Sequence, residues 1–155
     1  MSAAARVRRA ERSDLPRVAE LAAQHAEYER AAPPVPDLAK RLAALLFDTP
    51  APRLCCLVAE APDGEVVGYA TCAPELSTWE GREYLYLDCL FLAPGHRGLG
   101  LGALLMEAVA ERARGLGLPE VQWQTPAWND GAIRFYARLG ALGTDKRRFS
   151  LRVDA

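Results

Sequence analysis

A glycine-rich turn near the middle of the chain limits what this sequence can fold into more than any other feature. It reads Arg97-Gly98-Leu99-Gly100-Leu101-Gly102 and follows a strand-like apolar segment, residues 83–92. An amphipathic segment that ends near Arg114 comes after it. Glycines at alternate positions let backbone N–H groups converge on one anion, and a helix that begins there adds the positive end of its dipole. The turn is therefore typical of a phosphate site.

The hydrophobic pattern around this turn predicts an α+β fold with a mixed, mostly antiparallel sheet flanked by helices. Residues 54–59 and 66–73 form apolar, strand-like segments on either side of the turn Ala61-Pro62-Asp63-Gly64, which indicates a β-hairpin. An antiparallel meander followed by two helical crossovers belongs to this class. With 155 residues, the chain suits a single domain over residues 1–155. The other expected elements are strands at 6–10, 83–92, 121–125 and 148–153, and helices after Ser13 or Asp14, over 37–47, up to Arg114 and after Asn129.

Composition and charge exclude several classes of protein. The net charge is −1, from 19 basic and 20 acidic side chains, so no general positive field would attract nucleic acid or an anionic membrane. No apolar stretch approaches the ~20 residues of a membrane span, and the Arg-rich residues 1–12 lack the apolar core of a secretory signal. We therefore expect a cytoplasmic protein. The cysteines, Cys55, Cys56, Cys72 and Cys89, lack metal-ligand spacing, so we expect buried free thiols and no metal.

Besides a plain tight turn, three interpretations of the glycine-rich turn compete. A P-loop needs Lys-Ser/Thr after its last glycine, and Ala103-Leu104 stands there, which excludes it. A dinucleotide-binding fingerprint is formally met by Gly98, Gly100 and Ala103. That fingerprint normally opens a parallel sheet, and its next strand ends in an acid, whereas here the next strand ends in Gln124-Thr125. A plain tight turn leaves the glycines and the arginine unexplained.

The third interpretation is a resemblance to a known family. A strand, Arg-x-x-Gly-x-Gly and a helix resemble the pyrophosphate-binding motif of the GCN5-related N-acetyltransferases (GNAT), with Arg97, Gly100 and Gly102 at its fixed positions. Residues 128–141, which contain Asn129 and Ala132-Ile133-Arg134-Phe135-Tyr136, resemble the downstream helix of the same family. Within the family, Ala26-Glu27-Tyr28-Glu29, Trp79-Glu80-Gly81 and Tyr84-Leu85-Tyr86-Leu87-Asp88 are most similar to the diamine (spermidine/spermine) N-acetyltransferase group.

This resemblance implies a single-domain fold in which strands 83–92 and 121–125 splay to form a cofactor cleft. It also implies acetyl-CoA as co-substrate, direct attack by an amine in a ternary complex, and a homodimer. A CoA-binding module without transferase activity stays open as an alternative. The implied cofactor contacts are Leu90, Phe91, Leu92, Arg97, Gly98, Leu99, Gly100, Leu101, Gly102, Ala103 and Asn129.

Two residues are predicted to move protons. Tyr136 matches the tyrosine to which the family assigns the general-acid role, and a phenol can protonate a leaving thiolate. An alkyl amine has a pKa of ~10.4 and must lose a proton before it attacks. Asp88 is the candidate base, directly or through a water, because an acid inside an apolar strand is costly unless it is used or paired. The alternatives are a merely hydrogen-bonded buried carboxylate at Asp88 and, as bases, His25 and His96.

The acceptor is the least defined part of this prediction. By resemblance, the residues on the acceptor side are Tyr28, Glu29, Asp88, Gln122, Trp123 and Gln124. Lys146-Arg147-Arg148 brings positive charge near the end of the chain, where a polyamine site would favour acids. The sequence therefore leaves polyamines, amino acids and other small amines open.

Overall fold

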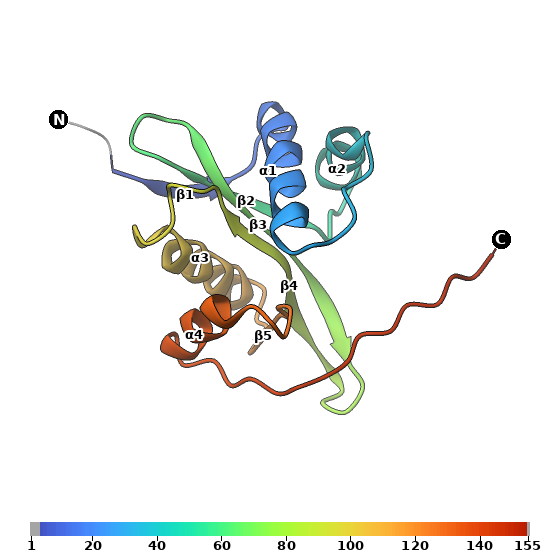
Figure 1. Cartoon of the computed structure of the whole chain (residues 1–155). Coiled ribbons are helices and arrows are strands. Elements are labelled where there is room, and N and C mark those ends of the chain that lie inside the picture. Colours follow the sequence, from blue (N-terminus) through green and yellow to red (C-terminus); the bar gives the residue numbers. More distant parts are fainter. Residues whose placement is uncertain (1–3, 155) are drawn as a thin grey trace. The chain divides into compact units, whose positions relative to one another are not determined.

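A computed structural model describes residues 4–154, so Ala155 and the first three residues of the Arg-rich N-terminal segment lie outside the described part. The chain divides into two compact units, one ending at Gln124 and the other beginning at Thr125. Figure 1 shows the course of the chain. Its elements are β1 (Arg6–Arg9), the 3-10 turn η1 (Arg12–Asp14), α1 (Leu15–Tyr28), α2 (Leu38–Phe47), β2 (Cys55–Glu60), β3 (Val66–Ser77), β4 (Arg82–Leu92), α3 (Leu101–Gly115), β5 (Val121–Gln122) and α4 (Asp130–Arg138).

The strands of the first unit form one sheet in the order β1-β2-β3-β4-β5. Neighbours from β1 to β4 are antiparallel, and β5 runs parallel to β4. The predicted mixed, mostly antiparallel sheet is confirmed. The dinucleotide interpretation is wrong, because that fold needs a parallel sheet with the glycine-rich turn in its first crossover.

Helices cover both faces of this sheet. On one face, α1 contributes Val18 and Leu21 to a buried cluster with Val58 and Phe91 of the sheet, and α2 packs against the same cluster. On the other face, α3 packs Leu105 and other residues against the sheet in a second cluster. Figure 1 shows α1 and α2 on one side of the strands and α3 on the other. Within the described chain, no helix has the length and apolar character needed to cross a bilayer.

Strand β4 contains a bulge at Asp88. Thr71 of β3 pairs with Cys89, and the next residue, Cys72, pairs with Leu87, so that Asp88 is the extra residue of β4. Leu87 belongs to the cluster on the α3 face, whereas Cys89 packs against the cluster on the α1 face. The bulge therefore changes which face each later residue of β4 points to.

Two predicted strands differ from the structure. Residues 148–153 alternate apolar and polar, yet they have no regular secondary structure in the described chain, and Phe149 is 85% exposed. A pattern of period two becomes a strand only where another strand edge pairs with it, and none pairs here among the described residues. The strand expected at 121–125 is confined to Val121–Gln122, because Pro126 closely follows and cannot donate to a ladder.

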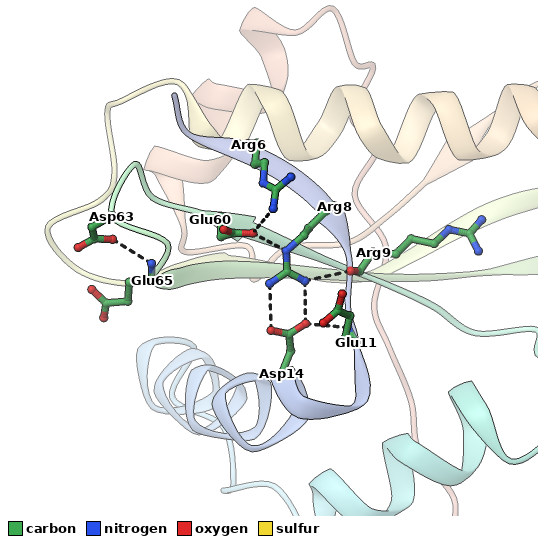
Figure 2. Close-up of polar contacts among 8 residues, drawn as sticks. All are labelled: Arg6, Arg8, Arg9, Glu11, Asp14, Glu60, Asp63 and Glu65. Carbon is green, nitrogen blue, oxygen red and sulfur yellow. Dashed lines mark hydrogen bonds and ion pairs between the residues drawn. The ribbon is translucent and has the colours of Figure 1, made fainter. Parts of the chain in front are cut away.

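A network of charged side chains links β1 to η1 and β2. Figure 2 shows Arg8 between Asp14 and Glu60. Its Nη1 and Nη2 donate to the two carboxylate oxygens of Asp14 at 2.8 and 3.1 Å, and its Nε donates to Glu60. Arg6 lies 3.3 Å from the same oxygen of Glu60. The hydrogen bonds from Arg8 lower the pKa of Asp14 and that of Glu60.

This network gives a prediction for the dependence of folding stability on pH. Because both pKa values are lowered in the folded state, the stabilisation is fully present above the unfolded-state values, which lie near ~4, and is lost as the pH falls through the folded-state values. We expect Arg8→Met to lower the free energy of unfolding at pH 7 and to flatten its decline between about pH 5 and 2. Urea unfolding followed by circular dichroism measures both effects. Arg41→Met is the control, since Arg41 pairs with Asp37 on the surface; an equal effect of both variants would contradict the prediction.

Candidate functional site

The glycine-rich turn connects β4 to α3 through backbone conformations that favour glycine. Gly98 and Gly100 have φ values of +78° and +82°. A Cβ atom on either would meet no other atom within 4 Å, so backbone conformation, not crowding, accounts for these two glycines. Gly100 is the N-cap of α3 and no side chain caps this helix end. The first amides of a helix have no partners within the helix, so this end fits a phosphate group.

Neighbouring residues of the turn have different surroundings. Leu101 is buried against Ala61 and Val67, and so anchors the first turn of α3 in the core. Only its backbone can therefore contact a ligand. Leu99 is exposed, as is Ala103 in the first turn of the helix.

Arg97 links the turn to the end of α1. Its Nε donates to the carbonyl oxygen of Leu92 at 3.1 Å. The guanidinium carbon lies 4.5 Å from the ring centroid of Tyr28 and 5.3 Å from that of Phe91. The structure thus brings a predicted cofactor residue, Arg97, next to a predicted acceptor residue, Tyr28, and it does so through cation–π contacts.

The strand edge predicted to hold a cofactor arm lies beyond the pairing of β4 with β5. These strands pair only at Leu85 with Val121 and Tyr86 with Gln122, and β4 then continues to Leu92. The side chain of Leu90 packs on the α3 face and that of Phe91 is buried on the α1 face. A strand that continues beyond its neighbour can pair its backbone with an extended, amide-containing ligand.

A chain of polar side chains runs from the bulge to the end of α1. The Cys89 thiol donates to Asp88 Oδ2 at 3.7 Å and interacts electrostatically with the hydroxyl of Tyr69. That hydroxyl is hydrogen-bonded to His25 Nδ1 at 2.9 Å. His25 Nε2 donates to Glu29 Oε2 at 2.8 Å, because a carboxylate can only accept. The structure therefore joins Asp88 and Glu29 through three intervening side chains.

These polar side chains differ in burial and in acidity. Asp88 is exposed, so the alternative of a buried, satisfied carboxylate is wrong; the bulge turns it out of the ladder. Burial raises the pKa of Tyr69 above its usual range. Burial and the charge of Asp88 raise the pKa of Cys89 to about 11. Both groups therefore hold their protons at neutral pH, and Cys89 is a poor nucleophile.

Sequence reasoning missed Tyr69 and its contact with His25. His25 is stacked on Phe91, with ring centroids 5.0 Å apart, and its side chain is 13% exposed. The i, i+4 spacing of His25 and Glu29 was a usable signal for one contact. No sequence signal pairs His25 with Tyr69, since they come from α1 and β3 and meet only after the helix packs on the sheet.

The three acceptor-side residues predicted near β5 do not form one group. Trp123 packs against the cluster on the α3 face. Gln122 donates to Glu120 at 2.7 Å, and Gln124 donates to the hydroxyl of Tyr86 at 3.0 Å. Alternation along an extended chain accounts for the difference, because successive side chains point to opposite faces.

The second unit contains the predicted residues Asn129 and Tyr136, both associated with α4. Asn129 is buried and its Oδ1 accepts from the backbone N–H of Ala132 at 3.2 Å, which confirms the predicted helix cap. Tyr136 lies on the last turns of the helix, and its ring centroid is 5.4 Å from that of Phe135.

Comparisons with known proteins identify the family. The chain matches the acetyltransferase (GNAT) family over residues 15–141. It is 34% identical over 142 residues to a thialysine N-epsilon-acetyltransferase of Bos taurus, covering 87% of this chain and 82% of that protein. It is also 34% identical over 79 residues to an L-ornithine N5-acetyltransferase of Arabidopsis thaliana, covering 51% of this chain and 35% of that protein. A possible acetyltransferase from Clostridium difficile 630 has a similar fold, with a TM-score of 0.79 at 19% identity, over 98% of this chain and 99% of that one. The family predicted from the glycine-rich turn and the later helix is confirmed: this chain is an N-acetyltransferase of the acetyltransferase (GNAT) family.

Proposed function

We propose that this enzyme transfers the acetyl group of acetyl-CoA to a primary amine of a small cationic acceptor, by direct attack in a ternary complex. Acetyl-CoA is proposed as the donor because the N-terminus of α3, which follows Gly98 and Gly100 and has no side-chain cap among the described residues, fits a pyrophosphate. Beyond Tyr86, β4 pairs with β3 but not with β5, and its free edge up to Leu92 suits the amide-containing pantetheine arm. Treating residues 1–155 as one catalytic domain is part of the proposal, and the family match across both units supports it.

The acceptor is proposed from charge and from relatives. Asp88 is exposed, Glu29 is partly exposed, and a series of polar contacts connects them, so two carboxylates belong to one polar network. Carboxylates favour an acceptor with ammonium groups. Two relatives act, by their names, on thialysine and L-ornithine, which are amino acids with a second amine. We therefore place amino acids of this kind ahead of polyamines as the substrate class.

Two residues carry the proposed proton transfers. Asp88 accepts the proton of the acceptor ammonium, directly or through a water, which leaves a neutral amine that can attack. Tyr136 donates its hydroxyl proton to the leaving thiolate of coenzyme A. A backbone N–H near Leu90 would stabilise the oxyanion of the tetrahedral intermediate. The cofactor supplies the activated thioester, and these residues of the chain orient it and move the protons.

The direct test combines binding and turnover. We expect acetyl-CoA, and not NAD, to raise the thermal midpoint of unfolding. A thiol-release screen with L-ornithine, thialysine, lysine and spermidine should then show turnover with at least one diamino acid. Binding of acetyl-CoA without thiol release for any amine would indicate a CoA-binding module and overturn the proposal. Turnover with spermidine alone would restore the polyamine assignment.

Gly100→Ala tests the turn as the phosphate site. An alanine at this φ is strained, by about 1–2 kcal/mol, and its methyl group would enter the open space in front of the helix end. We expect acetyl-CoA affinity, measured by calorimetry, to fall by roughly tenfold, which corresponds to about 1.4 kcal/mol. Gly64→Ala is the matched control, since Gly64 has a φ of +90° in the hairpin turn between β2 and β3. It should cost similar stability and leave the affinity unchanged; equal losses of affinity would contradict this assignment.

A further inference from the structure

Two buried cysteines face each other on the α3 side of the sheet. Cys55 of β2 and Cys72 of β3 are directly opposite in the antiparallel register, and they are 7% and 0% exposed. The Cys72 thiol lowers the pKa of Cys55, and Cys55 raises that of Cys72, so the two side chains interact. Directly opposite residues have Cα atoms roughly 4.5–5.5 Å apart, and disulfides span about 4.4–6.8 Å. Both thiols are free, and a disulfide fits between these strands without separating them.

An arginine of α3 lies over this pair with an unused donor. The Nε atom of Arg112 is buried and finds no hydrogen-bond partner among residues 4–154. Buried donors without a partner are rare in folded proteins. The charge of Arg112 acts on both Cys55 and Cys72, and Arg9 adds to it at Cys55. A thiolate at Cys55 would give this buried N–H a charged acceptor.

The four cysteines differ accordingly in acidity. The interaction with Cys72 and the charge of Arg112 lower the pKa of Cys55, and the same interaction between the thiols raises that of Cys72. Burial raises the pKa of Cys56 to about 12, and burial with Asp88 raises that of Cys89 to about 11. The thiolate is the reactive form of cysteine, so Cys55 is set apart from the other three.

We infer that Cys55 and Cys72, held under Arg112, form a peroxide-reactive dithiol that closes to an intrachain disulfide. The Cys55 thiolate attacks hydrogen peroxide; an S–O bond forms, the O–O bond breaks, and hydroxide leaves with a sulfenic acid on Cys55. The Cys72 sulfur then displaces the sulfenic oxygen, so that an S–S bond forms and the S–O bond breaks. The sulfenic oxygen leaves as water with the proton of Cys72. The hydroxide released in the first step takes a proton from solvent and forms the second water. Two thiols are oxidised and one peroxide is reduced.

The position of the dithiol links it to the proposed active site. Cys72 pairs on its other side with Leu87, at the step where the register shifts and Asp88 bulges out. A disulfide would draw Cys72 towards β2 and away from β4, since bridged Cβ atoms lie only about 3.8 Å apart. We expect the oxidised enzyme to have a several-fold lower kcat that thiol reductants restore. This consequence, unlike the disulfide itself, rests on the proposed function of Asp88.

Peptide mapping of the oxidised wild-type protein decides the chemistry without any variant. After one equivalent of hydrogen peroxide, the intact mass should fall by two hydrogens, and a peptide pair joined through Cys55 and Cys72 should appear and vanish with dithiothreitol. Oxidation of Cys56 or Cys89 first, or no cross-link between Cys55 and Cys72, would overturn the inference.

Variants test the part of Arg112 and the link to turnover. Arg112→Met should slow cross-linking severalfold, because loss of the positive charge raises the pKa of the Cys55 thiol and lowers its thiolate fraction. Cys56→Ala, which changes the adjacent buried cysteine, should leave the cross-linking rate unchanged.

In Cys55→Ala, peroxide should no longer lower kcat. An unchanged rate in Arg112→Met would remove Arg112 from the site, and full kcat in the cross-linked wild type would remove the link to Asp88. If no amine is acetylated at all, the proposed function fails, while the cross-link is still scored by mass.

Discussion

The substitution Tyr136→Phe should lower kcat by roughly 10²–10⁴, the range for loss of a general acid or base. The substitution removes one hydroxyl and keeps the ring that packs beside Phe135 on α4, so we expect the fold to survive. Acetyl-CoA affinity should be retained, because the hydroxyl acts on the thiolate only as it leaves. Below the thiol pKa of ~8.5, a rise in pH should not restore the rate, since the leaving thiolate still needs a proton there. Steady-state thiol release from pH 6 to 10, with calorimetry for acetyl-CoA, measures each of these effects.

The matched control for Tyr136→Phe is Tyr84→Phe, which removes a hydroxyl from a tyrosine of β4 that has no proposed role. It should leave kcat within about twofold of the wild type. Near-normal turnover in Tyr136→Phe, or a lower affinity for acetyl-CoA with an unchanged kcat, would remove the general-acid role from Tyr136.

The substitution Asp88→Asn should produce the second large loss of kcat, and the size of that loss should depend on pH. Without a carboxylate to accept the ammonium proton, only the neutral fraction of the acceptor reacts, and that fraction rises about tenfold per pH unit below the amine pKa of ~10.4. We expect a loss of roughly 10²-fold near pH 7 and recovery of most of the rate near pH 10. The exposed bulge position favours retention of the fold, because an amide there replaces no buried group. Circular dichroism and the full pH–rate profile test both expectations.

Glu83→Gln controls for the removal of a negative charge from β4. Glu83 is exposed at the start of the same strand, where it pairs with Leu76 of β3. Its profile should follow that of the wild type. Equal rescue by pH in Asp88→Asn and Tyr136→Phe would show that the two roles are wrongly divided, and a flat profile in Asp88→Asn would exclude Asp88 as the base.

Local pattern accounts for most of the fold prediction. Apolar residues at helical spacing predict α1, and Val18 and Leu21 are buried as that spacing requires. Apolar segments on either side of Asp63-Gly64 predict the hairpin of β2 and β3. Each signal is local in sequence, so the surrounding fold need not be known.

The parts that were missed depend on contacts between distant segments. Residues 148–153 alternate apolar and polar, as a half-buried strand would, yet no described strand pairs with them. The bulge at Asp88 is defined only by the register of β4 against β3. The contact of His25 with Tyr69 needs α1 to pack on the sheet first. Asp88 could therefore be named from sequence as a candidate base, but neither its exposure nor its partners could.

The bulge also sets what this enzyme can lose during evolution without losing its fold. Residue 88 is the extra residue of β4, so its deletion would leave Cys89 next to Leu87 in a regular ladder against β3. Leu90 and Phe91 would keep their opposite faces, and both packed surfaces would stay intact. The proposed base would be lost. Position 88 is therefore a place where a descendant of this chain can lose catalysis and keep its core.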